Sequence, residues 1–111
     1  MQRQTAKRLV VYLNVLDSHR AGTLYEAVVN LLREQGCAGA TVIKGVSGYG
    51  KSGTIHKAKA LSVTADVPVR IEAVDTEEKI SAVVPLVQEL VGDSGLIEVC
   101  DAEMIRFQKR A

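Results

Sequence analysis

The stretch Val67–Val74, which reads VPVRIEAV, alternates between apolar and charged side chains over its central part. Alternation of this kind is typical of a β-strand with one buried face, and it places Val69, Ile71 and Ala73 on that face. Pro68 lies at the start, where its missing N–H donor does least harm to strand pairing. We therefore predict a strand over 67–74 that packs one face on a second layer.

The residues after this strand predict an amphipathic helix. Asp75 or Thr76 can cap its start, and Glu77 and Glu78 in the first turn interact favourably with the helix dipole. Six apolar residues follow at helical spacing: Ile80, Val83, Val84, Val87, Leu90 and Val91. Pro85 lies inside this pattern and predicts a kink.

Three further strands and one helix are predicted outward from this centre. An apolar run over 9–16 and the segment Ala40–Val46 read as strands, and Leu96–Phe107 supplies the last one, a bulge near Asp101 being an option. Between the first two strands, the capping-box pattern Thr23-x-x-Glu26 begins a helix that Gly36 ends. Residues 55–61 read either as a short basic helix or as irregular chain.

The resulting order, β-α-β-β-α-β, predicts an α+β protein with the ferredoxin-like arrangement, in which two helices cover one face of an antiparallel sheet. The other face is left open. Yet the first strand is apolar on both sides, with Val10 and Tyr12 opposite Leu9, Val11 and Leu13. Such a run is normally buried on both faces, so we expect copies of the chain to associate through the open one.

Composition limits the class of protein. A chain of 111 residues with 47% hydrophobic and 24% charged residues predicts one globular domain over 1–111. No leader-like segment or 18-residue apolar run is visible, which predicts a cytoplasmic protein without membrane insertion. Few aromatic residues and a net charge of +1 argue against a nucleic-acid binder.

Few residues suggest metal or covalent chemistry. Cys37 and Cys100 lack metal-ligand spacing; buried thiols are the usual reading, and a disulfide between them stays open. His56 is a single loop histidine without a second ligand at suitable spacing, so its role in metal binding also stays open. No nucleophile–base pair or pair of carboxylates is visible, and we predict that the protein is not an enzyme.

The segment 45–53, GVSGYGKSG, matches the phosphate-loop pattern G-x-x-x-x-G-K-[ST]. A phosphate loop must enter a helix, however, and Gly53 followed by Thr54 and Ile55 makes a poor first turn. No Asp or Glu occurs over 36–65, whereas four lysines do: Lys44, Lys51, Lys57 and Lys59. Glycine amides beside lysines favour a phosphate-bearing ligand or an acidic partner; a solvated surface loop is the alternative.

We expect the loop over 48–65 to be mobile in the free protein and to become ordered with ligand or partner. Glycines, lysines of one sign and few large apolar residues give this segment little reason to order alone. Hydrogen exchange measures this directly. Strong amide protection in the unliganded protein would instead indicate a fixed structural role.

Several motifs together resemble the PII superfamily, and more narrowly its short PII-like branch, a domain-of-unknown-function family. They are LYEA at 24–27, GATV at 39–42, GYGKSG at 48–53 followed by Ile55-His56, and VRIEAVD at 69–75 running into EEKI at 77–80. The resemblance implies a homotrimer whose sheets face inward, with adenine nucleotides in the clefts between subunits. It also implies that the loop between the second and third strands docks on a partner protein, a membrane transporter being one candidate.

The resemblance also implies a set of ligand-binding residues. The loop-base motif corresponds to Gly48, Gly50, Lys51 and Ser52, and a nucleotide-contacting threonine to Thr41. The turn before the last strand corresponds to Gly92 and Asp93, and a phosphate-facing arginine to Arg106. The chain departs from PII proteins at other phosphate-neutralising positions, so ADP and AMP are as plausible as ATP, and no cofactor is required.

Two functions are therefore predicted from different classes. The first is a regulatory module that binds an adenine nucleotide and acts on a partner through the loop. The alternative is a trimeric metal- or small-anion-binding protein, related to copper-tolerance trimers and without nucleotide switching.

Overall fold

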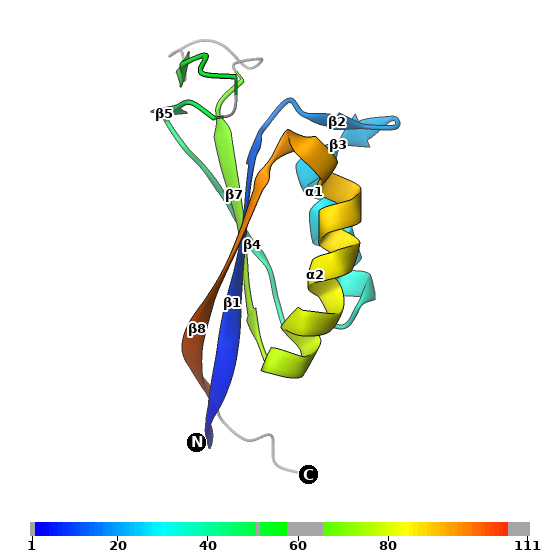
Figure 1. The fold of residues 1–111 in the computed structure, drawn as a ribbon, viewed down its shortest axis with the longest axis vertical. Coiled ribbons are helices and arrows are strands. Elements are labelled where there is room, and N and C mark those ends of the chain that lie inside the picture. The colour runs from blue at the N-terminus through cyan, green and yellow to red at the C-terminus, as the bar shows by residue number, and fades with distance from the viewer. Residues whose placement is uncertain (1, 51, 58–65, 107–111) are drawn as a thin grey trace.

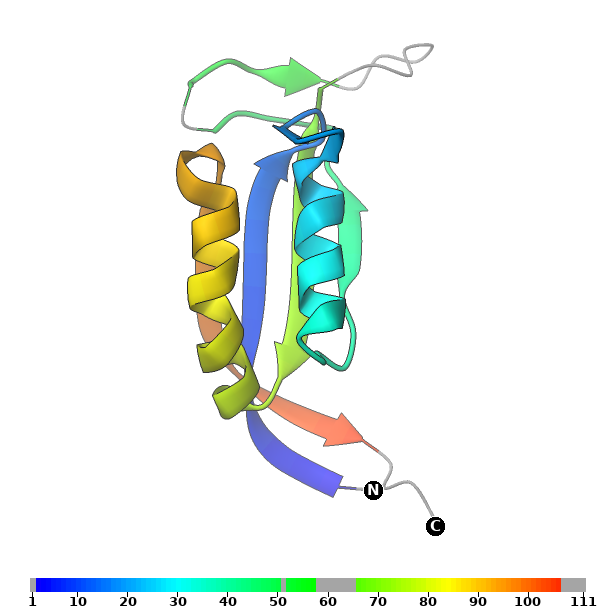
Figure 2. The ribbon, with the colours of Figure 1, turned by 90° about the vertical axis from the view of Figure 1, so that its right-hand side faces the viewer.

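The computed structural model describes residues 2–50, 52–57 and 66–106. Two helices lie side by side over one face of a four-stranded antiparallel sheet, and no helix of the described residues lies on the other face (Figures 1 and 2). The sheet order is β4-β7-β1-β8, from strands β1 Gln2–Asn14, β4 Thr41–Lys44, β7 Pro68–Asp75 and β8 Leu96–Arg106. With α1 Leu24–Glu34 and α2 Glu77–Val91 between them, this confirms the predicted ferredoxin-like fold.

Both helices begin at the caps that the sequence predicts. Thr23 Oγ1 accepts a hydrogen bond from the backbone N–H of Glu26 at 3.4 Å, which is half of the capping box before α1. Thr76 does the same for Lys79 at 3.1 Å and is the cap of α2, while Asp75 precedes it. Pro85 lies on the exposed side of α2, where the missing donor faces solvent, and α2 continues through it as one helix.

The core lies between the helices and the helix-facing side of the sheet. Leu9, Val11 and Leu13 of β1 alternate into it, as do Val69 and Ile71 of β7. The helices contribute the apolar positions that recur at helical spacing: Leu24, Val28, Leu32, Ile80, Val83, Val87 and Val91. The predicted alternation in both strands is therefore confirmed.

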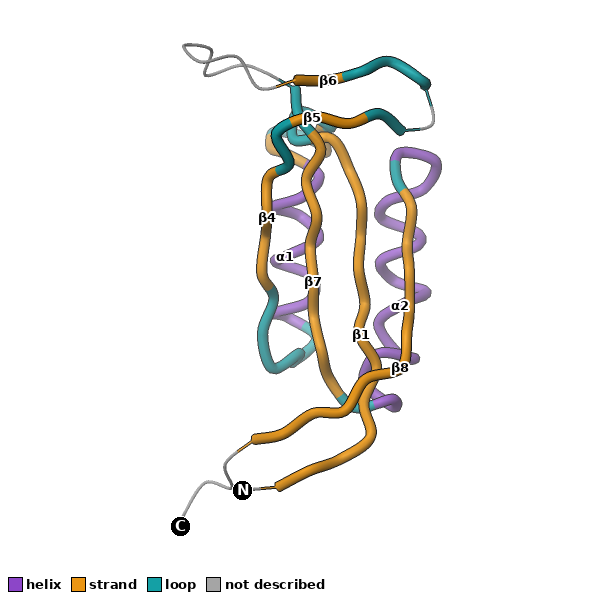
Figure 3. Tube along the Cα trace, turned by 90° about the vertical axis from the view of Figure 1, so that its left-hand side faces the viewer, coloured by secondary structure: helices purple, strands orange, loops and turns teal. Residues whose placement is uncertain are grey.

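The sheet extends beyond the helices as a two-stranded ribbon formed by the start of β1 and the end of β8 (Figure 3). Oppositely charged side chains face each other across it: Arg3 Nε lies 3.1 Å from Glu103, and Lys7 pairs with Asp101. This corrects the predicted start of the first strand at Leu9, since β1 already begins at Gln2. It also corrects the bulge considered near Asp101, because the β1–β8 register runs without interruption from Gln2↔Arg106 to Tyr12↔Leu96.

Short hairpins and turns complete the fold. Strands β2 Ser18–His19 and β3 Gly22–Thr23 form one hairpin, and β5 Ser47–Gly48 and β6 His56–Lys57 form another. The second hairpin corrects the helical or irregular reading at 56 and 57, because His56 and Lys57 pair with the glycine segment, while 58–61 lie outside the described residues. A 3-10 turn, η1 Gly92–Ser94, links α2 to β8.

Some predictions concern residues outside the described ranges, among them Lys51, Phe107 and residues 58–65 of the loop predicted over 48–65. Within the described ranges no helix is long and apolar enough to cross a membrane. Cys37 and Cys100 are both free thiols. Each is partly buried, and no disulfide joins them.

Candidate functional site

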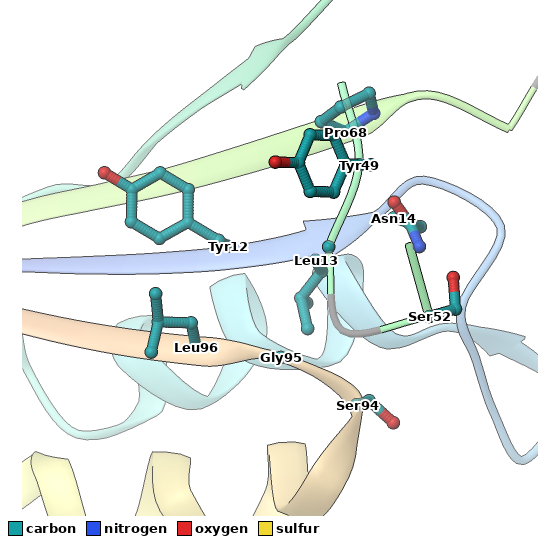
Figure 4. A pocket seen from close by; sticks show the side chains of 10 residues that line it. Tyr12, Leu13, Asn14, Tyr49, Ser52, Pro68, Ser94, Gly95 and Leu96 are labelled. Carbon is teal, nitrogen blue, oxygen red and sulfur yellow. The ribbon is translucent and has the colours of Figure 1, made fainter. Parts of the chain in front are cut away.

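A pocket of about 1030 Å³ lies at the end of the sheet beneath the loop that connects β4 to β7 (Figure 4). Part of its wall comes from the sheet and the turn before β8, and part from the loop. The described lining residues are Tyr12, Leu13, Asn14, Tyr49, Gly50, Ser52, Pro68, Ser94, Gly95 and Leu96. None of these carries a charged side chain, so the described lining suits a flat, largely apolar group.

The sheet part of the pocket belongs to the side that the helices leave bare, which we call the open face. Tyr12 and Asn14 of β1 alternate with the core residues Leu13 and Val15, and Tyr12 lies directly opposite Leu96 of β8 in the register. Tyr12 is 37% exposed and Leu96 65% exposed. The pocket is therefore the loop-side end of the open face.

Less of β1 is apolar and exposed on this face than the sequence predicts. Val10 is only 1% exposed within one copy of the chain. It stands between Glu72 and Glu98 in the register, and the longer side chains on this face shield it. The exposed apolar residues of the open face are instead spread across three strands: Ile43, Tyr12 and Leu96.

The loop approaches the sheet closely at two glycines, and at one of them there is no room for a side chain. A Cβ at Gly48 would lie 2.8 Å from Cγ of Pro68, the first residue of β7. Gly45 also lies against Pro68, whose carbonyl oxygen accepts a hydrogen bond from the Gly45 N–H at 2.7 Å. Glycines thus hold the loop base against β7 and bring Tyr49, Gly50 and Ser52 over the pocket.

Gly95 has an equivalent role on the opposite wall. A Cβ there would lie 2.3 Å from the carbonyl oxygen of Tyr12 and 2.5 Å from Cδ2 of Leu13. No real Cβ approaches other heavy atoms this closely, so only glycine permits β8 to start against β1 at this point.

The structure brings some of the predicted ligand residues together and leaves others apart. Gly50 and Ser52 line the pocket, and Gly48 lies beside it against Pro68. Gly92 and Asp93 form the η1 turn directly before the lining residues Ser94 and Gly95. Lys51 falls outside the described residues.

Thr41 and Arg106 do not line this pocket. Thr41 begins β4 on the open face, opposite Glu72, whereas the strand ends near the loop. Arg106 ends the ribbon, at the opposite end of the molecule from the loop (Figure 1). Within one copy of the chain these two residues therefore lie apart from the pocket wall that Gly50 and Ser52 form.

The sheet side of the pocket was not predicted from the sequence: Tyr12, Asn14, Pro68, Ser94, Gly95 and Leu96. One signal for Tyr12 was present, because period-two alternation places it on the face opposite Leu13. Nothing in the sequence shows that the loop folds back over that face. The sequence does not indicate the direction in which the loop runs after β4.

The open face also carries charged groups close to the pocket. Arg70 and Glu72 of β7 form an ion pair, and the Tyr12 hydroxyl donates a long hydrogen bond of 3.5 Å to Glu98. Farther along, on the ribbon, hydrogen bonding to Asp101 raises the pKa of Lys7, and the same bond lowers the pKa of Asp101. Both partners stay charged near neutral pH and hold the ribbon strands in register.

The buried carboxylate Asp75 has a structural role. Its two oxygens accept hydrogen bonds from the backbone N–H groups of Ala38 at 2.8 Å and Thr76 at 2.7 Å. Lys79 Nζ donates to the carbonyl oxygen of Gln35 at 2.8 Å, so both side chains tie the end of α1 to the start of α2. Burial, with a further contribution from Asp75, raises the pKa of Cys37, which keeps this thiol protonated and weakly nucleophilic.

Comparison with known proteins agrees with the fold and identifies the relatives. The model of the DUF190 family, described as an uncharacterized ACR, matches residues 6–104. A UPF0166 protein of Methanocaldococcus jannaschii is 35% identical over 101 residues, covering 91% of this chain and 93% of the relative. A UPF0166 protein of Aquifex aeolicus is 33% identical over 100 residues, covering 89% and 92%.

Solved structures with this fold include PII-like proteins. CPII of Thiomonas intermedia, a nitrogen regulatory PII-like protein bound to ADP, AMP and bicarbonate, has a TM-score of 0.67 at 23% identity, covering 95% of this chain and 92% of that one. A putative PII-like signalling protein of Thermus thermophilus has a TM-score of 0.63 at 17% identity, covering 94% and 91%. At these identities the likeness establishes the fold.

Proposed function

The chain belongs to the DUF190 family, and we propose that it is a PII-like regulatory protein that binds an adenine nucleotide in the pocket beneath the loop between β4 and β7. The observation that carries this proposal is the pocket itself. It combines an aromatic, uncharged described lining with a glycine-rich loop whose sequence suits phosphate. CPII, which has the same fold, has been solved with ADP and AMP bound.

The two parts of the pocket suit the two parts of a nucleotide. Tyr12 and Tyr49 supply aromatic rings and Leu96 an apolar side chain, which favour a flat heteroaromatic base. Gly50 and Ser52 lie on either side of Lys51 and can offer backbone N–H groups to the phosphates. ADP, AMP and ATP all fit this description.

The proposed site is completed by other copies of the chain. Its sheet side lies on the open face, so a second copy on that face would close the pocket. This arrangement would also account for Thr41 and Arg106, which lie apart from the loop and would reach the ligand from neighbouring copies. We propose a homotrimer, which is the number implied by the resemblance to PII proteins.

Regulation would follow from the position of the loop. Tyr49, Gly50 and Ser52 contact the proposed ligand space, so occupancy would change the conformations open to the whole β5–β6 hairpin. Lys57 ends β6 of this hairpin and Lys44 ends β4 just before it, and neither has an acidic residue nearby in sequence. An acidic surface on a partner protein, a membrane transporter being one candidate, would recognise them.

A small carboxylate-like anion is a second candidate ligand. CPII has been solved with bicarbonate alongside ADP, and with acetate alongside ADP and AMP. For a metal ion the structure gives less support, because the described residues contain no group of three or more His, Cys, Asp or Glu side chains placed to hold one. Calorimetry with ADP, AMP, ATP, bicarbonate and divalent metals separates these functions, and absence of any nucleotide binding would overturn the proposal.

We expect Lys51→Ala to weaken nucleotide binding by about 1.5–3 kcal/mol, the range for a hydrogen bond to a charged group. Calorimetry with ADP measures the change. Lys57→Ala, which removes a charge from the same loop outside the proposed phosphate site, is the matched control and should change the affinity much less. Equal losses of affinity in both variants would show that Lys51 acts only through the positive potential of the loop and does not contact the phosphate.

The bound nucleotide is expected to persist without turnover. No catalytic base or pair of acids stands among the described lining residues. Release of phosphate from ATP with Mg²⁺, abolished by Lys51→Ala, would contradict this and favour a phosphate-loop hydrolase.

A further inference from the structure

The strand register arranges the open face in rows that cross the sheet. One row runs from β4 to β8 through Ile43, Arg70, Tyr12 and Leu96. The next row runs through Thr41, Glu72, Val10 and Glu98. In these two rows β7 carries the ion pair of Arg70 and Glu72, β8 carries Glu98, and Tyr12 of β1 lies between Arg70 and β8.

The guanidinium of Arg70 has more N–H donors than there are acceptors bonded to it. Its Nη2 pairs with Glu72, but its Nε is buried and has no hydrogen-bond partner among the described residues. An arginine offers five N–H donors, and a single carboxylate contact leaves several of them unused. The side chain is 43% exposed, so its remaining Nη N–H groups can donate to a second acceptor from outside the chain, although the buried Nε cannot.

Glu98, in contrast, is an acceptor with few donors. It is exposed on β8, and in the described part of the chain its carboxylate has only the long hydrogen bond from Tyr12 and forms no ion pair. A strand directly beyond β8 is absent from the sheet order of the described residues, so this side is the edge of the sheet. A carboxylate at that edge can meet a group from another molecule.

We propose that Arg70 of one copy of the chain binds Glu98 of the next, and that this pair sets the register in which the open faces associate. In a closed ring each copy presents two different sides to its two neighbours. The β7 side of every copy would then meet the β8 side of the next, with Arg70, which is also paired with Glu72, facing Glu98 at each interface. The exposed apolar residues Ile43 and Leu96 stand in the same row as Arg70 and would exclude water from the pair.

This inference rests on the assembly included in the proposed function, and it adds the pair of residues that specifies the interface. A charge swap tests it on the full-length protein without nucleotide, with the molar mass measured by light scattering. Arg70→Glu and Glu98→Arg are each expected to weaken association at least about 30-fold, toward the 12.0 kDa monomer. The double variant Arg70→Glu/Glu98→Arg is expected to restore the wild-type mass.

Three controls make the result specific. Arg33→Glu and Glu89→Arg reverse charges on the exposed helix surfaces and should leave the mass unchanged. Arg8→Glu reverses a cation elsewhere on the open face, and Glu98→Arg should not rescue any loss that it causes. Circular dichroism of each variant confirms that it is folded, and Glu98→Arg, at an exposed edge position, is the variant least able to disturb folding.

The outcomes separate this inference from the proposed function. A monomeric wild-type protein would overturn the proposed assembly itself. An assembled wild type whose single variants stay assembled, or whose double variant stays monomeric, would overturn only the Arg70–Glu98 pair. Intact assembly of Arg70→Glu together with lost bicarbonate binding would assign Arg70 to a small anion instead.

Discussion

Replacement of Tyr12 by aspartate is expected to dissociate the assembly and to abolish nucleotide binding in the same variant. Tyr12 is one of the exposed apolar residues of the open face, and it also lines the pocket. A buried aromatic residue at the centre of an interface commonly contributes about 2–4 kcal/mol, and a desolvated carboxylate in its place would add a further cost. Leu13 is 5% exposed on the helix side, so Tyr12 is the residue of this pair that faces a partner.

Light scattering and calorimetry on the same samples measure both effects. Leu86→Asp is a matched control, because Leu86 on α2 is 39% exposed, close to the 37% of Tyr12, and lies away from the open face. Tyr12→Phe keeps the ring and should preserve both properties. A soluble Tyr12→Asp monomer that still binds nucleotide would contradict both the interface and the shared site.

The variant Gly95→Ala is expected to destabilise the folded chain by about 3 kcal/mol or more. The added Cβ would lie 2.3 Å from a backbone oxygen of β1, and neither strand can move without breaking the pairing that begins at Tyr12↔Leu96. Overpacking of this kind commonly costs about 1–3 kcal/mol, and contact with rigid backbone lies at the upper end. Urea unfolding measures the loss.

Gly39→Ala is the control for Gly95→Ala, since nothing lies within 4 Å of a Cβ at Gly39 and its backbone is not in the left-handed region. It should change the free energy of unfolding by only a few tenths of a kcal/mol. A Gly95→Ala protein as stable as this control would show that β8 can start farther from β1 than the structure has it.

The elements that could be predicted are those whose own sequence contains the cause of their structure. Alternation over 67–74 predicted β7 and its buried face, because a strand that is buried on one side has apolar side chains at every second position. Thr23 and Thr76 marked the helix starts, because a cap needs only a hydroxyl and the first turn beside it. These signals are local, and the structure contains the elements that they predict.

The elements that could not be predicted depend on distant partners. The first half of β1 contains Arg3, Gln4 and Lys7, and it forms a strand only because β8 faces it with Glu103 and Asp101. Val10 appeared to need a second molecule, but neighbouring strands already shield it. The loop side of the pocket could be predicted because the glycine loop has a local sequence signature. The sheet side could not, because those residues line the pocket only as a result of the direction in which the loop folds.

The central position of β1 has a consequence for folding during synthesis. This strand is synthesised before the other strands of its sheet, yet one of its two neighbours is β8, the last strand described; Lys7 and Asp101 are 94 residues apart. The apolar segment of β1 therefore cannot be paired on both sides until β8 has been synthesised. Contacts of such long range slow folding and leave apolar strands exposed to misassociation, so the nascent chain is expected to depend on chaperones more than a helical protein of its size.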